Sequence, residues 1–205
     1  RDVAPSRGLG DVYKRQFLER EDKLTISPFL MRDMDKAAAR VQRAIADGEK
    51  IAVFGDYDVD GVCATSMLLM YLRACGAAVS YHIPSRHAEG YGMNLAAVER
   101  LAAEGVGLIV TVDNGVKANA ELLRCRELGM DAIVTDHHLP GDTLPECEAI
   151  LCHTLPGCAY PNHNICGAGT AFKLIEALGG RAAALPYVAL AGLATVADVV
   201  PLTGE

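Results

Sequence analysis

The chain has 205 residues, about half of them apolar, and a formal net charge of -7. This length suits one domain, or one domain and the start of a second, and no apolar run is long enough to cross a bilayer. The acidic balance excludes a protein held to nucleic acid by its surface field alone, because such proteins are usually basic. A polyanionic partner would require metal ions that reverse the field locally.

The N-terminal residues 1–16 differ from the rest of the chain. They lack apolar periodicity, lead abruptly into Phe17 and resemble sequence translated from an adapter or a cloning scar. We therefore expect a non-native or disordered leader over 1–16 and one domain over 17–205.

Short apolar segments alternate with helical patterns along the chain. A first helix is predicted from Ser27-Pro28 to Gly48, because a capping residue and a proline begin the helical spacing. Strands are predicted at 50–54, 77–83, 107–112, 131–135 and 149–152. Further helices are predicted at 62–75, 94–104, 116–128, 167–178 and 182–197. This alternation predicts an α/β fold with a parallel sheet of about five strands and helices on both faces.

The cysteine pattern indicates reduced thiols in a cytoplasmic protein, since the number is odd and no C-x-x-C occurs. The seven are Cys63, Cys75, Cys125, Cys147, Cys152, Cys158 and Cys166. The last four cluster with His153 and His163, but their spacing matches no zinc module. We therefore expect ordinary loop cysteines there and not a zinc site.

Residues of the metal-ligand type follow three of the predicted strands. They are Asp56, Asp58 and Asp60 after the first strand, Asp113 after the third, and Asp136, His137 and His138 after the fourth. The carboxyl ends of parallel strands share one edge of a sheet, so these side chains are expected to converge. Crowded carboxylates repel one another unless a cation lies between them. The pattern predicts Mn²⁺ or Mg²⁺, and two such ions can clamp a phosphoryl displacement.

Each of these motifs has an alternative interpretation. The segment 56–61 is similar to the opening of a Ca²⁺ loop, but the glutamate expected at the twelfth position is missing and a strand leads in. The segment 113–115 alone favours a simple turn, and a histidine pair at a strand end is also compatible with a solvated loop. Their common position at one sheet edge favours the metal site.

The triplet Asp136-His137-His138 is the signature of the DHH phosphoesterase family, which the chain resembles from about residue 47 to residue 205. Within that family the likeness is to RecJ-type single-strand-specific exonucleases. Five further motifs carry the resemblance in the family's order, at 53–61, 89–94, 111–115, 166–174 and 194–202.

The resemblance implies a set of five metal ligands, namely Asp58, Asp60, Asp113, His137 and Asp198. It also implies that His138 contacts the scissile phosphate or assists the leaving group, with Asp56 and Asp136 in support. Some members carry histidine where Phe54 stands, so one metal site is either depleted or completed by another group. Arg86 is expected to meet a substrate phosphate, with a plain surface arginine as the alternative.

Gly167 and Gly169 open a predicted helix, where free backbone N–H groups can receive a phosphate; tight helix packing is an equally good explanation. RecJ-type members degrade single-stranded DNA from the 5′ end to mononucleotides, in DNA repair and recombination. They carry DHH-associated and oligonucleotide-binding domains that grip the strand, and we expect these to be missing beyond Glu205.

The resemblance thus implies a cytoplasmic enzyme whose partner is single-stranded DNA and not a membrane. Two alternatives stay open. One is a relative that acts on short oligoribonucleotides, cyclic dinucleotides or phosphoadenosine phosphate. The other is an inactive binding module on the same fold.

Overall fold

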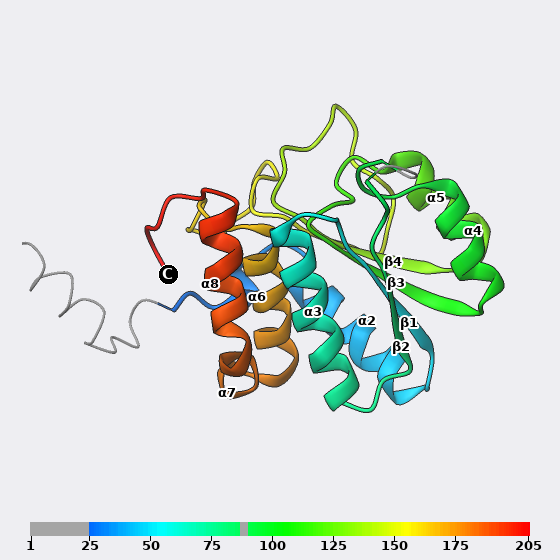
Figure 1. Ribbon diagram of the computed structural model, residues 1–205, viewed down its shortest axis with the longest axis horizontal. Helices are drawn as coiled ribbons and strands as arrows, with labels where there is room; N and C mark the ends of the chain where they lie inside the picture. The colour runs from blue at the N-terminus through cyan, green and yellow to red at the C-terminus, as the bar shows by residue number, and fades with distance from the viewer. Residues whose placement is uncertain (1–24, 87–89) are drawn as a thin grey trace, which may run out of the picture.

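The computed structural model describes residues 25–86 and 90–205, so the predicted leader and part of the 89–94 motif lie outside the described residues. Five strands form one sheet in the order β2-β1-β3-β4-β5, and every pairing is parallel. Their bounds are β1 Lys50–Phe54, β2 Val79–His82, β3 Val106–Val112, β4 Asp131–Thr135 and β5 Ala149–Leu151. The predicted α/β fold with a five-stranded parallel sheet is confirmed (Figure 1).

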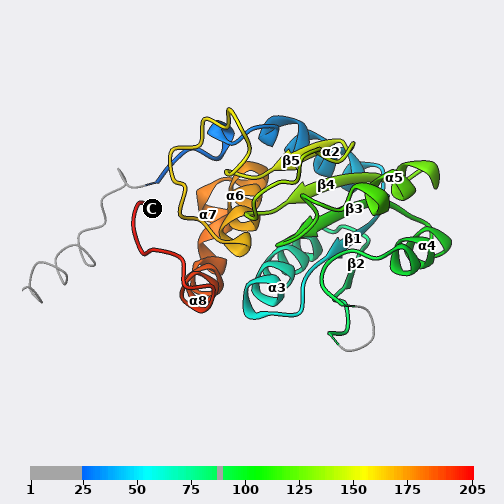
Figure 2. The same ribbon diagram turned by 90° about the horizontal axis from the view of Figure 1, so that it is seen from above.

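Helices cover both faces of the sheet, as predicted, because successive strand residues point alternately into two cores. One core contains Ile51 and Val53 and is covered by α2 (Met34–Ala46), α3 (Val59–Ala74) and α6 (Gly167–Gly179). The other contains Ala52 and Phe54 and is covered by α4 (Leu95–Ala103) and α5 (Asn119–Glu127). Figure 2 shows the two layers on either side of the strands.

Phe54 is fully buried in the second core, and its ring packs edge-on against His82 at 4.8 Å between centroids. Its side chain therefore contributes to packing on the α4/α5 face.

No helix in the described part of the chain is long and apolar enough to span a membrane.

The strand order reverses between β1 and β3, and this point locates the candidate site. The chain runs from β1 outward to β2, then returns to β3 on the other side of β1 and continues to β4 and β5. In open parallel sheets, a crevice forms beyond the carboxyl ends of the strands at such a switch point. The loops that carry the predicted ligands follow β1, β3 and β4, at this edge.

Two helix starts differ from the predicted ones for a reason that concerns the site. α3 begins at Val59 and not at residue 62, because the Asp58 side chain accepts a hydrogen bond from the Gly61 N–H at 2.9 Å and caps the helix. α5 begins at Asn119 and not at residue 116, because the Val116 N–H donates to Asp136 Oδ2 at 2.9 Å. A local cap thus decides where α3 begins, and a tertiary contact decides where α5 begins.

The other differences from the predicted helices lie away from the strand ends. Ser27 caps no α-helix: a short 3-10 turn η2 (Pro28–Leu30) precedes α2, which begins after Asp33. The predicted helix 182–197 is broken into α7 (Arg181–Ala184), a 3-10 turn η3 (Leu185–Tyr187) and α8 (Val188–Ala197). The break lies at Pro186, which has no N–H for a helical hydrogen bond.

Candidate metal centre

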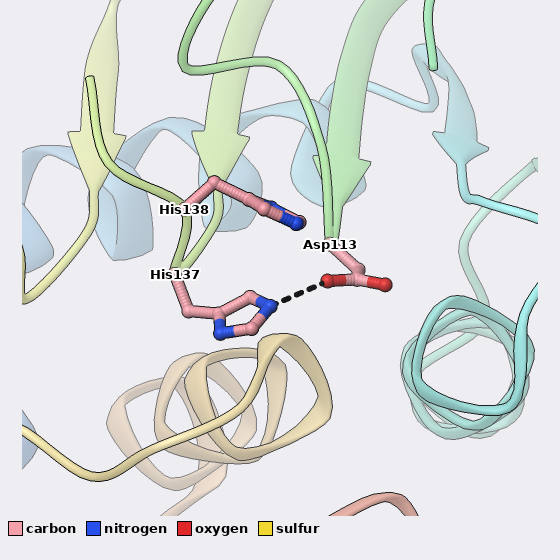
Figure 3. A group of neighbouring side chains, drawn as sticks. All are labelled: Asp113, His137 and His138. Atoms are coloured by element: carbon pink, nitrogen blue, oxygen red, sulfur yellow. Dashed lines mark ion pairs between the residues drawn. The ribbon is translucent and has the colours of Figure 1, made fainter. Parts of the chain in front are cut away.

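Seven predicted residues lie together at the carboxyl ends of β1, β3 and β4, and Asp198 joins them from the end of α8. Figure 3 shows His137 and His138 projecting from the end of β4 beside Asp113, which follows β3. His137 Nε2 lies 3.1 Å from Asp113 Oδ1. The convergence that was predicted from strand ends is therefore present in the structure.

One group of potential ligands consists of Asp60, His137 and Asp198, whose ligand atoms lie within 4.8 Å of one another. His137 is central, because its Nε2 is 3.7 Å from Asp60 Oδ2 and its Nδ1 is 3.8 Å from Asp198 Oδ2. Each ring nitrogen of His137 thus has a carboxylate oxygen within 4 Å.

A second group consists of Asp56, Asp58 and Asp113, again with ligand atoms within 4.8 Å of one another. Asp56 is fully buried, and neither of its carboxylate oxygens has a hydrogen-bond partner. The backbone N–H groups of Tyr57 and Gly92 lie near this carboxylate without forming a well-aligned bond. Asp56 therefore offers oxygen ligands to a cation, whereas the Phe54 side chain offers none.

Asp113 lies where the two groups meet, since it also forms a third group with His137 and His138. It is 1% exposed, and its Oδ1 has no hydrogen-bond partner. Its backbone is left-handed, with φ of 61°, a conformation that aspartate tolerates better than most residues. A Cβ on Gly167 would lie 2.6 Å from the Asp113 side chain, so this close approach requires glycine.

The burial and the mutual repulsion of these carboxylates favour a bound cation. Burial, together with the charges of Asp60 and Asp58, raises the pKa of Asp113 to about 10. Burial also raises the pKa of Asp56 and that of Asp198. Buried anionic oxygens without hydrogen bonds are unfavourable, and a divalent cation with oxygen and imidazole ligands removes the cost. The donor set present in the chain thus suits Mn²⁺ or Mg²⁺.

His138 is oriented by a hydrogen bond with Asp136. Its Nδ1 lies 2.7 Å from Asp136 Oδ1, and this hydrogen bond raises the pKa of His138. Burial acts to raise the pKa of Asp136, but hydrogen bonds from His138 and from the Val116 N–H outweigh it and lower the pKa. Asp136 is thus an ionised, fully engaged carboxylate that orients the imidazole.

Tyr91 was not singled out in the sequence, although it lies in the 89–94 motif. Its hydroxyl donates to the carbonyl oxygen of Asp113 at 3.2 Å and lies 3.1 Å from His138 Nε2. Tyr91 therefore links His138 to the backbone of a candidate ligand, Asp113. No spacing rule in the sequence could have found this contact, because 47 residues separate Tyr91 from His138.

Arg86 lies at the outer end of an aromatic series. Its guanidinium stacks over the Tyr57 ring at 5.0 Å from the centroid, and Tyr57 packs edge-on against Tyr91 at 6.2 Å. Arg86 is exposed. A phosphate-binding role for Arg86 remains a prediction, and this exposure near the cluster is compatible with it.

The two glycines of α6 make contacts within the chain. Asp60 accepts hydrogen bonds from the N–H groups of Gly167 and Ala168, both at 2.7 Å, and the Gly169 N–H donates to Cys166 Sγ at 3.4 Å. The helix N-terminus therefore holds a carboxylate of the protein itself. These contacts favour the packing explanation of both glycines over phosphate binding.

The cysteines form no metal group with His153 and His163: the potential metal groups of the described residues contain only aspartate and histidine, and all seven cysteines are free. His153 is 5% exposed and its Nδ1 has no hydrogen-bond partner. Burial, with the fields of His137 and His163, lowers the pKa of His153 to about 4.

The buried His153 leads to a pH dependence of stability. Between about pH 6.5 and pH 4 the unfolded chain binds a proton at this residue that the folded chain does not, so stability present above pH 6.5 is lost as the pH falls. At pH 5 we expect the loss to be on the order of 2 kcal/mol. Urea unfolding at pH 7.5 and pH 5.0 should show a much smaller loss for His153→Asn. His163→Asn, at an exposed position, removes only a minor cause of the shift and should lose nearly as much stability as the wild type. Equal losses for all three proteins would contradict this account.

Comparison with known proteins agrees with this fold and cluster. Residues 50–197 match the family model described as DHH family, N-terminal domain. The chain therefore belongs to the DHH family.

Among its relatives, the single-stranded-DNA-specific exonuclease RecJ of Bacillus subtilis (strain 168) is 45% identical over 193 residues, which are 93% of this chain and 24% of that protein. A crystal structure of exonuclease RecJ bound to manganese superposes with a TM-score of 0.79 at 38% identity, over 88% of this chain and 46% of that one. RecJ of Thermus thermophilus in complex with Mn²⁺ gives 0.75 at 34% identity, over 94% of this chain and 28% of that one. The chain thus spans less than half the length of these relatives.

Proposed function

We propose that this chain is the metal-binding catalytic domain of a single-stranded-DNA exonuclease that hydrolyses phosphodiester bonds from the 5′ end. The single observation that carries the proposal is the set of buried Asp56 and Asp113 oxygens without hydrogen bonds, next to His137 and His138. The kinship with RecJ proteins supports the choice of substrate.

In this proposal the ligands divide between two ions. Asp60, His137 and Asp198 would hold one, and Asp56 and Asp58 the other, with Asp113 shared. Bound divalent cations supply positive charge to the phosphate oxygens and acidify an attacking water. Asp56 would thereby supply the ligand that a histidine at the position of Phe54 supplies in some family members.

The other side chains position the substrate and move the proton. His138, oriented by the hydrogen bond to Asp136 that also raises its pKa, would donate a proton from Nε2 to the leaving oxygen. Arg86 would attract a backbone phosphate. The domain is proposed to span 17–205, and further domains such as those of the longer relatives would deliver the strand. The seven free thiols support a cytoplasmic location.

The test offers the protein a 5′-labelled single strand, the corresponding duplex and a short dinucleotide in the presence of Mn²⁺. We expect the single strand to be shortened from its 5′ end to mononucleotides, with no reaction after chelation of the metal. A preference for the dinucleotide would instead favour a relative that acts on small substrates. If neither substrate were hydrolysed while Mn²⁺ was bound, a binding module would be the better explanation.

A further inference from the structure

A small cavity adjoins His138 on the side of Tyr91, apart from the two groups of metal ligands. Its volume is ≈ 190 Å³. Its walls include Tyr91, Met93, Val116, Lys117, Ala118 and His138. At about 30 Å³ for each water in the liquid, the cavity has room for a ring-sized group but is smaller than a pocket for a whole drug-sized ligand.

The chemistry of the walls favours a neutral ring over a phosphate. Met93, Val116 and Ala118 present apolar atoms, and both oxygens of the Asp136 carboxylate in the wall already accept hydrogen bonds from His138 and from backbone N–H groups. The walls therefore suit an apolar ring better than a charged group that needs several hydrogen bonds. Lys117 is exposed and makes no ion pair among the residues that the structure describes. It is therefore free to meet a phosphate at the mouth.

Tyr91 supplies a rigid surface for stacking. Its ring is 53% exposed, although its hydroxyl is held by the Asp113 carbonyl oxygen and by His138. An exposed aromatic ring fixed beside a reactive centre is suited to stacking on a base, and such stacking tolerates every base.

We propose that this cavity receives the nucleobase of the nucleotide next to the scissile bond, with Lys117 pairing with that nucleotide's phosphate. The inference rests on the proposed function and adds to it a base subsite. The Asn114 side chain in the cavity wall uses its Nδ2 to donate to the carbonyl oxygens of Phe54 and Val112, and its Oδ1 has no hydrogen-bond partner but is buried away from the cavity space. Recognition is therefore by shape and stacking, and bases are bound with little discrimination.

The test measures binding by calorimetry to the 205-residue protein loaded with Mn²⁺, and it requires no turnover. The probes are deoxyadenosine monophosphate, thymidine monophosphate, deoxyribose 5-phosphate and inorganic phosphate. We expect both nucleotides to bind at least tenfold more tightly than the sugar phosphate and within about threefold of each other.

Variants separate the two parts of the subsite. Ala118→Phe should fill the cavity and remove the advantage of the nucleotides, with Mn²⁺ binding intact; Ala118→Leu is the smaller second variant if the first does not fold. Lys117→Gln should weaken binding of nucleotides and of the sugar phosphate by the same factor of about three to ten. Lys36→Gln, at an exposed lysine on the opposite edge of the sheet, should have no effect.

The proposal is overturned if the nucleotides bind no better than deoxyribose 5-phosphate, or if both Ala118 variants keep the full advantage. Inorganic phosphate that binds as well as the nucleotides and depends on Lys117 would show a phosphate site instead. The proposed function fails separately, when the wild-type protein with Mn²⁺ does not hydrolyse bis(4-nitrophenyl) phosphate, a diester without a base.

Discussion

Asp113→Asn is expected to lower Mn²⁺-dependent hydrolysis by about a thousandfold or more without unfolding the protein. Asp113 belongs to one candidate ion group and lies 3.1 Å from His137 of the other, where the proposal has it shared by both ions. Loss of several kcal/mol of charge stabilisation corresponds to at least three factors of ten in rate. Asparagine tolerates the left-handed backbone at this position, so the fold should persist. Single-turnover rates on a labelled strand and thermal unfolding measure both effects.

The same substitution should raise stability in the absence of metal. Because the folded-state pKa of Asp113 is about 10, the folded protein retains a proton that the unfolded chain releases above about pH 4. The contribution of this carboxyl to stability is therefore lost as the pH rises from about 4 towards 10, and asparagine removes this loss. Mn²⁺ should then raise the melting temperature of the wild type much more than that of the variant.

Asp142→Asn, on an exposed loop, provides the matched control and should change neither activity nor the response to Mn²⁺. If Asp113→Asn kept its activity with Mn²⁺ bound, Asp113 could not be the shared ligand.

Asp60→Ala is expected to damage both activity and folding, in contrast to Asp113→Asn. Asp60 is 2% exposed and receives two hydrogen bonds of 2.7 Å from the N-terminus of α6, in addition to facing His137. Alanine leaves the buried N–H groups of Gly167 and Ala168 without partners, at a cost of about 3 kcal/mol. For a chain of this size each kcal/mol lowers the melting temperature by roughly 2–4 °C.

The two effects of Asp60→Ala are separable by experiment. Thermal unfolding in chelator reports the helix contact alone, and titration with Mn²⁺ reports the ligand. Asp60→Asn keeps one acceptor oxygen, so it should recover part of the stability but little of the activity. Asp35→Ala, in the exposed first turn of α2, is the matched control. A melting temperature unchanged by Asp60→Ala would mean that the α6 contact contributes nothing to stability.

Strand ends were the most informative part of the sequence. The β-branched and apolar runs identified all five strands, and the polar residues directly after three of them identified seven residues that the structure brings together. This succeeded because parallel strands place their carboxyl ends at one edge, whatever lies between them in the chain. The convergence of Asp56, Asp113 and His137 therefore followed from topology alone.

Helix starts and contacts from distant segments could not be predicted in the same way. The start of α5 depends on the hydrogen bond from the Val116 N–H to Asp136, which forms only in the assembled site, whereas Asp58 caps α3 locally, three residues from Gly61. Asp198 ends a helix in an apolar stretch, and only the family resemblance indicated a role for it. The glycines at 167 and 169 suggested an anion, and the anion found there is the chain's own Asp60.

Because Asp198 lies at the end of α8, the group formed by Asp60, His137 and Asp198 is complete only when α8 is in place. Asp56, Asp58 and Asp113 come from loops that follow neighbouring strands, whereas the other group takes its third ligand, Asp198, from the end of α8. Several side chains on α8, among them Leu193 and Val196, are more than half exposed. Occupancy of the ion held by Asp60, His137 and Asp198 should therefore report how firmly α8 packs on the domain. A change that loosens this helix should split a single metal-binding isotherm into a tight step and a weak one.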